Sequence, residues 1–159
     1  MKTYNETYNS VFEKFISIEE SFDYVPENIE KNVFNKADHL NIEYTFDINE
    51  KTYQVDIRIY NDKTAKFLFA LISGDDFNPL GITQTGDSHL VFGAVANIFK
   101  RFVSEYSDKF KKIIFIGSKK DKNRTRLYDR FVKNSWILSN FDVDIEDDFD
   151  VKYYILSKK

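Results

Sequence analysis

HLNIEYTFDINEKTYQVDIRIYNDKTAKFLFALIS, residues 39–73, contains three runs of strand-like sequence separated by two short polar turns. In the first two runs apolar and polar residues alternate, which is typical of strands with one buried and one solvated face. The third run, residues 65–73, is apolar on both faces and is expected near the middle of a sheet. Joined by the turns NEK and NDKT, the runs predict an antiparallel meander. The alternating apolar residues are Leu40, Ile42, Tyr44, Phe46 and Ile48 in the first run and Tyr53, Val55, Ile57 and Ile59 in the second.

Two helices are expected ahead of the meander. Residues 6–20 place apolar side chains at three- and four-residue steps, the spacing of one helix face. Pro26 suits the first turn of a second helix. The inward face of that second helix would consist of Ile29, Val33 and Phe34.

After the meander, a loop at residues 74–86 holds three of the five glycines and one of the two prolines. Asp87 or Ser88 can cap a helix that runs to about residue 107. KKIIFIGS, residues 111–118, is expected to be a buried strand. The apolar stripe of the helix is Val91, Ala94, Val95, Ile98, Phe99, Phe102 and Tyr106.

The C-terminal part predicts one more helix and two strands. NRTRLYDRFVKNSW, residues 123–136, has the pattern of one short amphipathic helix, capped by Asp121 or Asn123. SNFDVDIEDDFDVKYYILSKK then predicts two strands around an acidic turn. The inward face of the helix is expected to be Leu127, Tyr128, Phe131 and Val132.

Composition limits the classes of protein and site. A chain of 159 residues predicts a single domain, 1–159, and 42% hydrophobic with 17% aromatic residues favours a folded chain. The net charge of −3 gives no general drive towards nucleic acid or anionic membranes. Without cysteine, disulfides and thiolate metal sites are excluded, and two distant histidines argue against a histidine-rich metal site. No apolar run approaches the ~18 residues of a membrane span, so no membrane partner and a cytoplasmic location are expected.

The predicted order is helix, helix, three strands, helix, strand, helix and two strands. This order resembles the acyl-CoA N-acyltransferase (GNAT) fold without its first strand, an α/β (α+β) fold with a mostly antiparallel central sheet flanked by helices. The local match is best at residues 111–136, where the strand IIFIG leads through a polar turn into NRTRLYDRFVK. The family has a similar stretch, with an Asn and an Arg ahead of a Leu-Tyr pair and a basic residue after it.

The resemblance implies roles for particular residues. In many GNAT members the tyrosine of this stretch protonates the departing thiolate of coenzyme A, which implies Tyr128 as the general acid and Asn123 beside the cofactor. A narrower similarity covers roughly residues 65–136. There the GIT-TG loop, the VF helix and the R-LYDR helix resemble a group of small bacteriophage proteins. This second resemblance implies a phage origin.

The expected cofactor loop departs from the GNAT pattern. These enzymes hold the pyrophosphate of acetyl-CoA on backbone N–H groups at a helix N-terminus, after Gln or Arg, two residues, Gly, one residue, and Gly or Ala. Here one residue, instead of two, separates Gln84 from Gly86, and Asp87 stands where a small residue is expected. No Arg or Lys occurs in residues 67–99. Each nearby acidic charge would repel an anion by about 1 kcal/mol at contact distance. If acetyl-CoA binds, the amides of Gly86, Asp87 and Ser88 would hold it.

Other polar residues leave alternatives open. Glu43, Asp47, Asp56 and His89 are candidates for a general base, although their spacing singles out none of them. Acids that alternate in a meander normally form its solvated face, and a histidine in the first turn of a helix normally has an exposed or capping role. The basic turn SKKDKNRTR, residues 118–126, is either a phosphate site or a solvated turn.

The acidic run and the aromatic surplus suggest contacts with other proteins. The run FDVDIEDDFD, residues 141–150, is a solvated turn, a mimic of nucleic-acid phosphates or a dock for a basic partner. With 16 Phe and 10 Tyr, not every ring can fit inside one core, and such rings are enriched at protein interfaces. Exposed candidates are Tyr4, Tyr60, Phe77 and Tyr153. The acidic residues are Asp142, Asp144, Glu146, Asp147, Asp148 and Asp150.

Three functional hypotheses follow. The first is a phage-encoded, GNAT-like protein without catalysis that acts through protein contacts, either in the virion or with a host protein in the host cytoplasm, with an oligomer as one option. The second is an active acyl-CoA N-acyltransferase that uses acetyl-CoA, with Tyr128 as general acid. The third is an acidic inhibitor of a host nucleic-acid enzyme. No metal site is expected in any of them.

Overall fold

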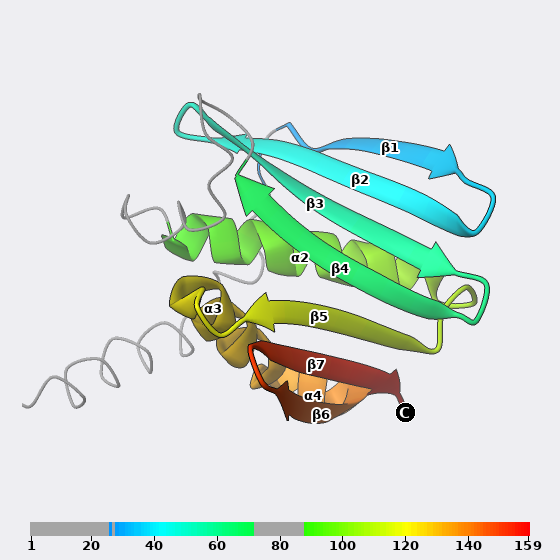
Figure 1. Cartoon of the computed structure of the whole chain (residues 1–159). Helices are drawn as coiled ribbons and strands as arrows, with labels where there is room; N and C mark the ends of the chain where they lie inside the picture. Colours follow the sequence, from blue (N-terminus) through cyan, green and yellow to red (C-terminus); the bar gives the residue numbers. More distant parts are fainter. Residues whose placement is uncertain (1–25, 27, 72–87) are drawn as a thin grey trace, which may run out of the picture.

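The computed structural model describes residue 26, residues 28–71 and residues 88–159, and this part of the chain contains a seven-stranded sheet and three helices (Figure 1). The helix expected at residues 6–20 and the loop at 74–86 lie outside the described residues. The strands are β1 (Glu30–Asn35), β2 (His39–Ile48), β3 (Lys51–Tyr60), β4 (Thr64–Leu71), β5 (Lys112–Ser118), β6 (Phe141–Asp148) and β7 (Val151–Lys158). The helices are α2 (Ser88–Tyr106), α3 (Lys122–Val132) and α4 (Ser135–Asn140).

The sheet has the order β1-β2-β3-β4-β5-β7-β6, and only the β4–β5 pair is parallel. The predicted meander is confirmed as β2, β3 and β4, which pair antiparallel in that sequence. Strand β4 lies fourth of the seven, as its apolar sequence predicted. The predicted fold class is therefore confirmed, because the chain is a mixed α/β protein with a mostly antiparallel sheet flanked by helices.

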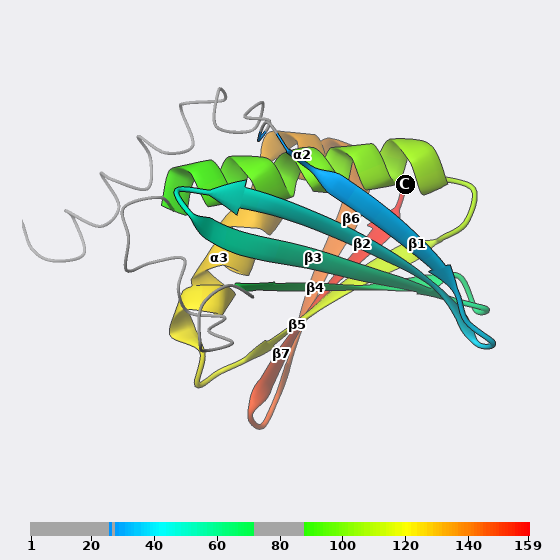
Figure 2. The same cartoon turned by 90° about the horizontal axis from the view of Figure 1, so that it is seen from above.

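One face of the sheet forms the hydrophobic core beneath α2. The alternating apolar residues of β2 and β3 point to this face and are buried, while the polar residues between them point to the other face. Figure 2 shows α2 lying along the buried face. In β4 the alternation also holds, because Phe67 and Phe69 are buried whereas Lys66 and Leu68 are exposed. The second face of β4 is therefore not covered to the same degree, although its sequence is apolar.

The core is rich in aromatic rings that centre on Phe99 of α2, which is fully buried. Its ring makes edge-on or tilted contacts at centroid distances of 5.0–6.0 Å, the geometry that aromatic pairs prefer. These contacts join β4, β5, α3, α4 and β6 to α2. The contacting rings are those of Phe67, Phe115, Phe131, Trp136 and Phe141.

The predicted second helix is wrong, because residues 30–35 form the edge strand β1. The three residues between β1 and β2 make a tight connection, and β1 pairs with β2 from Glu30 opposite Thr45 to Asn35 opposite Leu40. All six residues of β1 are exposed, including Val33 at 46% and Phe34 at 41%. Three apolar residues were too few to bury a helix face, whereas the adjacent strand offers a complete set of backbone partners. The sheet therefore has an N-terminal strand that the predicted order lacked.

The single helix expected at residues 123–136 is also wrong, because it is divided into α3 and α4. Asn134 has an extended backbone, with φ −65° and ψ 140°, and its side chain accepts a hydrogen bond of 2.8 Å from the Trp136 N–H. Asparagine commonly caps helix N-termini in this way, so it ends one helix and begins the next. The predicted inward face of α3 is confirmed as buried: Leu127, Tyr128, Phe131 and Val132.

Candidate functional site

The parallel strands β4 and β5 pair only over their first halves. Their register runs from Thr64 opposite Lys112 to Phe67 opposite Phe115, although β4 continues to Leu71 and β5 to Ser118. Figure 1 shows the two strands further apart at their C-terminal ends, where α2 and α3 begin. Helix N-termini carry backbone N–H groups without a partner inside the helix and the positive end of the helix dipole. This end of the sheet is the place where an anionic cofactor would find such groups.

The predicted cofactor residues are only partly placed by the structure. Ser88 is the first residue of α2, and Asn123 lies in the first turn of α3. Both therefore belong to the end where β4 and β5 separate. Gly86 and Asp87 lie outside the described residues. Their role in holding acetyl-CoA stays a prediction.

Tyr128 is buried between α3 and the sheet, and only 2% of it is exposed. Its ring centroid lies 5.3 Å from that of Phe115 on β5 and 5.6 Å from that of Tyr154 on β7. Gly117 allows α3 to approach this closely. A Cβ atom at position 117 would lie 3.0 Å from Thr125 Cγ2 and 3.6 Å from Tyr128 Cδ2. Tyr128 is thus part of the packing that fixes α3 to β5.

A polar cluster that sequence reasoning missed lies beside Tyr128. The hydroxyl of Tyr154 donates to Asp129 Oδ1 at 2.7 Å and lies 3.2 Å from the carbonyl oxygen of Thr125. Lys152 Nζ lies 3.0 Å from the same Asp129 oxygen. Burial and the bond to Asp129 raise the pKa of Tyr154 well above its usual range. The cluster joins α3 to β7. In the sequence it was indicated only by a tyrosine within an alternating strand.

The general-base candidates Glu43 and Asp56 are cross-strand partners on the sheet face opposite α2. Asp56 Oδ2 lies 3.4 Å from Arg58 Nε, and burial raises the pKa of Asp56 although Arg58 opposes that shift. Asp47, also on β2, is exposed and accepts a hydrogen bond of 2.6 Å from Thr52. His89 lies in the first turn of α2.

These positions separate Tyr128 from two of the candidate bases, Glu43 and Asp56. Tyr128 packs against Phe115, whose side chain lies on the α2 face, while the alternation of β2 and β3 directs Glu43 and Asp56 to the other face. Acetyl-CoA would supply a thioester-bound acyl group, and Tyr128 would have to reach its sulfur. A ring that is 2% exposed does not fit that requirement. The catalytic role of Tyr128 stays a prediction.

The acidic run forms an exposed β6–β7 hairpin, and its turn points away from α2 (Figure 2). Phe149 in this turn is 91% exposed, more than any other large hydrophobic residue that the structure describes. Of the predicted exposed rings, Tyr60 and Tyr153 are half-buried, while Tyr4 and Phe77 lie outside the described residues. The sequence signal for Phe149 was its place between Asp148 and Asp150, and our reasoning overlooked it.

The basic turn at residues 118–126 lies against the acidic turn. The Lys119 N–H donates to the carbonyl oxygen of Asp150 at 2.8 Å, and Lys119 Nζ lies 3.2 Å from Asp147 Oδ1. This part of the basic cluster is therefore partly neutralised within the chain. That pairing fits a structural role for Lys119 better than a phosphate-binding role.

Within the described residues, no group of three or more His, Cys, Asp or Glu side chains is arranged to hold a metal ion. No helix in the same part of the chain is long and apolar enough to cross a membrane.

Comparison with known proteins finds a weak structural similarity to an acetyltransferase. No protein-family model and no curated protein sequence matches this chain. Among solved structures, a mutant form of spermidine N-acetyltransferase SpeG from Vibrio cholerae is similar with a TM-score of 0.39 and 12% sequence identity. The match covers 74% of this chain and 65% of that chain, so it spans less than two thirds of the acetyltransferase. A likeness at this level carries no argument about activity, and the fold class therefore stands on the strand order.

Proposed function

We propose that this chain is a phage-encoded protein of GNAT-like fold that acts through protein contacts and does not catalyse acyl transfer. Its partner would be a virion component or a host protein in the host cytoplasm. The observation that carries the proposal is Phe149, which stands 91% exposed between two aspartates at the tip of the β6–β7 hairpin. The phage origin is supported by the resemblance of residues 65–136 to small bacteriophage proteins.

The position of Phe149 supports a contact role because its ring does not stabilise the folded chain there. Turns favour Gly, Pro, Asn, Asp and Ser for their backbone geometry, and phenylalanine has no such advantage. An almost fully exposed ring also gains little from burial within its own chain. In protein interfaces, by contrast, aromatic side chains are enriched, and a few such anchors provide most of the binding energy.

The neighbourhood of Tyr128 supports the non-catalytic part of the proposal. The ring fills space between Phe115, Gly117 and Tyr154, as a core side chain does. The carboxylates of Glu43 and Asp56 lie on the opposite face of the sheet. An acid and a base on opposite faces cannot act on one substrate within hydrogen-bond reach or through one water.

The alternative is an active acyl-CoA N-acyltransferase, and the separation of β4 from β5 favours it. The amides of Gly86, Asp87 and Ser88 would bind the pyrophosphate, where Ser88 is the first residue of α2 and Asn123 lies in the first turn of α3. Tyr128 would then act as general acid after a movement that exposes its hydroxyl.

Calorimetric titration with acetyl-CoA separates the two functions. We expect no saturable heat even at millimolar acetyl-CoA, which corresponds to a binding free energy weaker than about −4 kcal/mol. Titration of acetyl-CoA into buffer without protein provides the heat of dilution. Saturable binding that is lost when the loop around Gly86 is replaced by a serine-rich loop of equal length would contradict the proposal and establish the alternative.

An acidic inhibitor of a host nucleic-acid enzyme is a third reading, favoured by the exposure of the acidic side chains of β6. Under this reading, neutralising Glu146, Asp147 and Asp148 together would abolish binding to the host enzyme. Unchanged binding of that triple variant would rule the reading out.

A further inference from the structure

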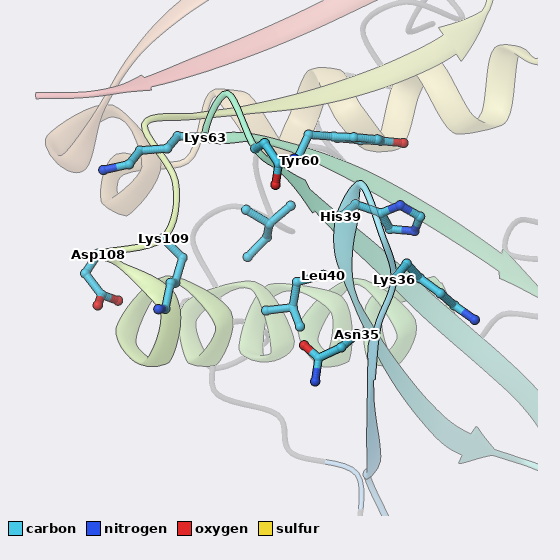
Figure 3. A pocket seen from close by; sticks show the side chains of 10 residues that line it. Asn35, Lys36, His39, Leu40, Tyr60, Lys63, Asp108 and Lys109 are labelled. Carbon is cyan, nitrogen blue, oxygen red and sulfur yellow. The ribbon is translucent and has the colours of Figure 1, made fainter.

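A pocket of about 550 Å³ opens at the end of the sheet where the β1–β2 and β3–β4 turns meet the segment after α2 (Figure 3). Its floor contains Leu40 and Ile59, and Ile59 is 6% exposed. Its described lining includes three lysines and one aspartate, so that fully ionised side chains give a net charge of +2. The lining residues are Asn35, Lys36, His39, Leu40, Ile59, Tyr60, Asn61, Lys63, Asp108 and Lys109.

The lysines stand on the rim of the pocket rather than in its floor. Figure 3 shows Lys63 and Lys109 on one side, Lys36 and His39 on the other, and Leu40 between them. All three lysines are exposed. Exposed side chains change rotamer within nanoseconds, so these ammonium groups can turn towards a bound anionic group. An apolar floor inside a cationic rim suits a ligand with an apolar centre and acidic flanks.

The β6–β7 turn has this composition. Phe149 provides an exposed ring, and Asp148 and Asp150 flank it directly. Both aspartates are exposed. A cavity of about 150 Å³ can accommodate a benzene molecule, so the pocket is large enough for a phenylalanine ring and part of the turn around it.

The turn and the pocket of one molecule lie at opposite ends of the sheet. Val151 at the turn pairs with Ser118, the last residue of β5, whereas Lys112 at the start of β5 pairs with Thr64 beside the pocket. Strand β7 alone, with eight residues, spans about 25 Å between these ends. A turn therefore cannot reach the pocket of its own chain.

We infer that the β6–β7 turn of one copy docks into this pocket of a second copy, with the Phe149 ring over Leu40 and Ile59 and its flanking aspartates beside Lys63 and Lys109. The contact joins two different surfaces and is therefore heterologous, so repetition closes a ring or extends a filament. The inference deepens the proposed function and rests on it, because a self-assembling protein is one that acts through protein contacts.

The first experiment measures the mass of the full chain by sedimentation velocity from about 1 µM to about 1 mM, the range in which weak contacts become populated. We expect the weight-average mass of the natural chain to rise with concentration. The Phe149→Ala variant should stay monomeric over the same range. Ile145→Ala is the matched control, since it removes a 41% exposed apolar side chain from the same hairpin but outside the turn, and it should associate like the natural chain.

The second experiment exchanges the charges of the two surfaces. Asp148→Lys with Asp150→Lys makes the turn basic, and Lys63→Glu with Lys109→Glu makes the pocket acidic. Each double variant alone should stay monomeric, because like charges then meet at the contact. A mixture of the two should associate, since each turn again finds a pocket of opposite charge. Asp142→Lys with Asp144→Lys, which changes the net charge equally at the anchored end of the hairpin, should associate like the natural chain.

The outcomes are distinguishable from those of the acetyl-CoA titration. A chain that stays monomeric at about 1 mM, or charge-exchanged variants that do not associate when mixed, would overturn the inference. If the chain is monomeric and the NMR signals of the pocket residues shift when pyrophosphate is added, the pocket binds a small anion instead. A monomer that captures a host protein through Phe149 would also overturn it. None of these results bears on acetyl-CoA binding. The proposed function is contradicted only by saturable binding in the acetyl-CoA titration.

Discussion

The tripeptide Phe-Asp-Val occurs twice in the C-terminal hairpin, at residues 141–143 and 149–151, and its phenylalanine has opposite environments in the two places. Phe141 is 2% exposed and contacts the rings of Phe99 and Trp136, whereas Phe149 is 91% exposed. The first lies where α4 and α2 cover the sheet, and the second lies in the turn beyond them. Identical local sequence therefore does not determine burial. Under our proposal the start of β6 serves folding, and the turn after β6 serves contact with other molecules.

The largest effect should come from Phe141→Ala, which empties a ring site in the aromatic core. Deletion of a buried phenylalanine costs about 3–5 kcal/mol of the free energy of unfolding. Urea denaturation followed by circular dichroism measures this loss. A loss of unfolding free energy below about 1 kcal/mol, which is typical of surface positions, would show that Phe141 contributes no more to stability than an exposed residue such as Phe149.

A smaller effect is expected from Tyr154→Phe on β7, beside the anchored part of the hairpin. The change removes the hydroxyl that donates to the Asp129 carboxylate at 2.7 Å, and a hydrogen bond to a charged group is worth about 1.5–3 kcal/mol. Tyr153→Phe is the matched control, since its ring is half-buried on the opposite face of β7. Equal losses in both variants, measured by the same urea denaturation, would show that the Tyr154 hydroxyl contributes nothing specific.

The buried tyrosines also predict a loss of stability at alkaline pH. Burial raises the pKa of Tyr44 to about 12, and burial with Asp129 raises the pKa of Tyr154, while an unfolded tyrosine titrates near 10. Above pH ~10 the unfolded chain loses these protons first, so it binds fewer protons than the folded chain and stability falls as pH rises. Unfolding free energies measured between pH 8 and pH 11 should fall less steeply for Tyr154→Phe than for the natural chain. Identical slopes would contradict the shift at Tyr154.

The smallest effect on stability is expected from Phe149→Ala. A surface substitution away from packed features changes the free energy of unfolding by no more than about 0.5 kcal/mol. Urea denaturation should be run at a concentration low enough to keep every species monomeric, because self-association would otherwise add to the apparent stability. A loss as large as that of Phe141→Ala would show that the turn belongs to the folding core.

Much of the fold could be predicted from the sequence because its signals were periodic. Strands β2 and β3 alternate along their whole length, and α2 and α3 bury the faces that their apolar spacing predicted. Strand β1 could not be predicted, since an exposed edge strand buries none of its residues and depends on its neighbour for pairing. The break before α4 depended on the side chain of Asn134, whose capping bond has no periodic signal.

The candidate site was less predictable than the fold, because it depends on which face and which end of the sheet each residue occupies. Sequence analysis named Tyr128 as the acid and Glu43, Asp47, Asp56 and His89 as candidate bases. The sheet separates the tyrosine from Glu43 and Asp56. The pocket is formed by turns that are distant in the sequence, so no spacing in the sequence could bring Lys63 and Lys109 together. Phe149 had a local signal, its place between two aspartates, but this signal does not by itself give the exposed fraction of the ring.

The most direct test of the division between folding and contact is the sedimentation of Phe149→Ala beside the natural chain at equal concentration. Our account predicts that the natural chain sediments as an assembly near 1 mM, while the folded variant sediments as a monomer. Assembly of the variant to the same mass as the natural chain would contradict the account, because the exposed ring would then have no part in any contact between copies.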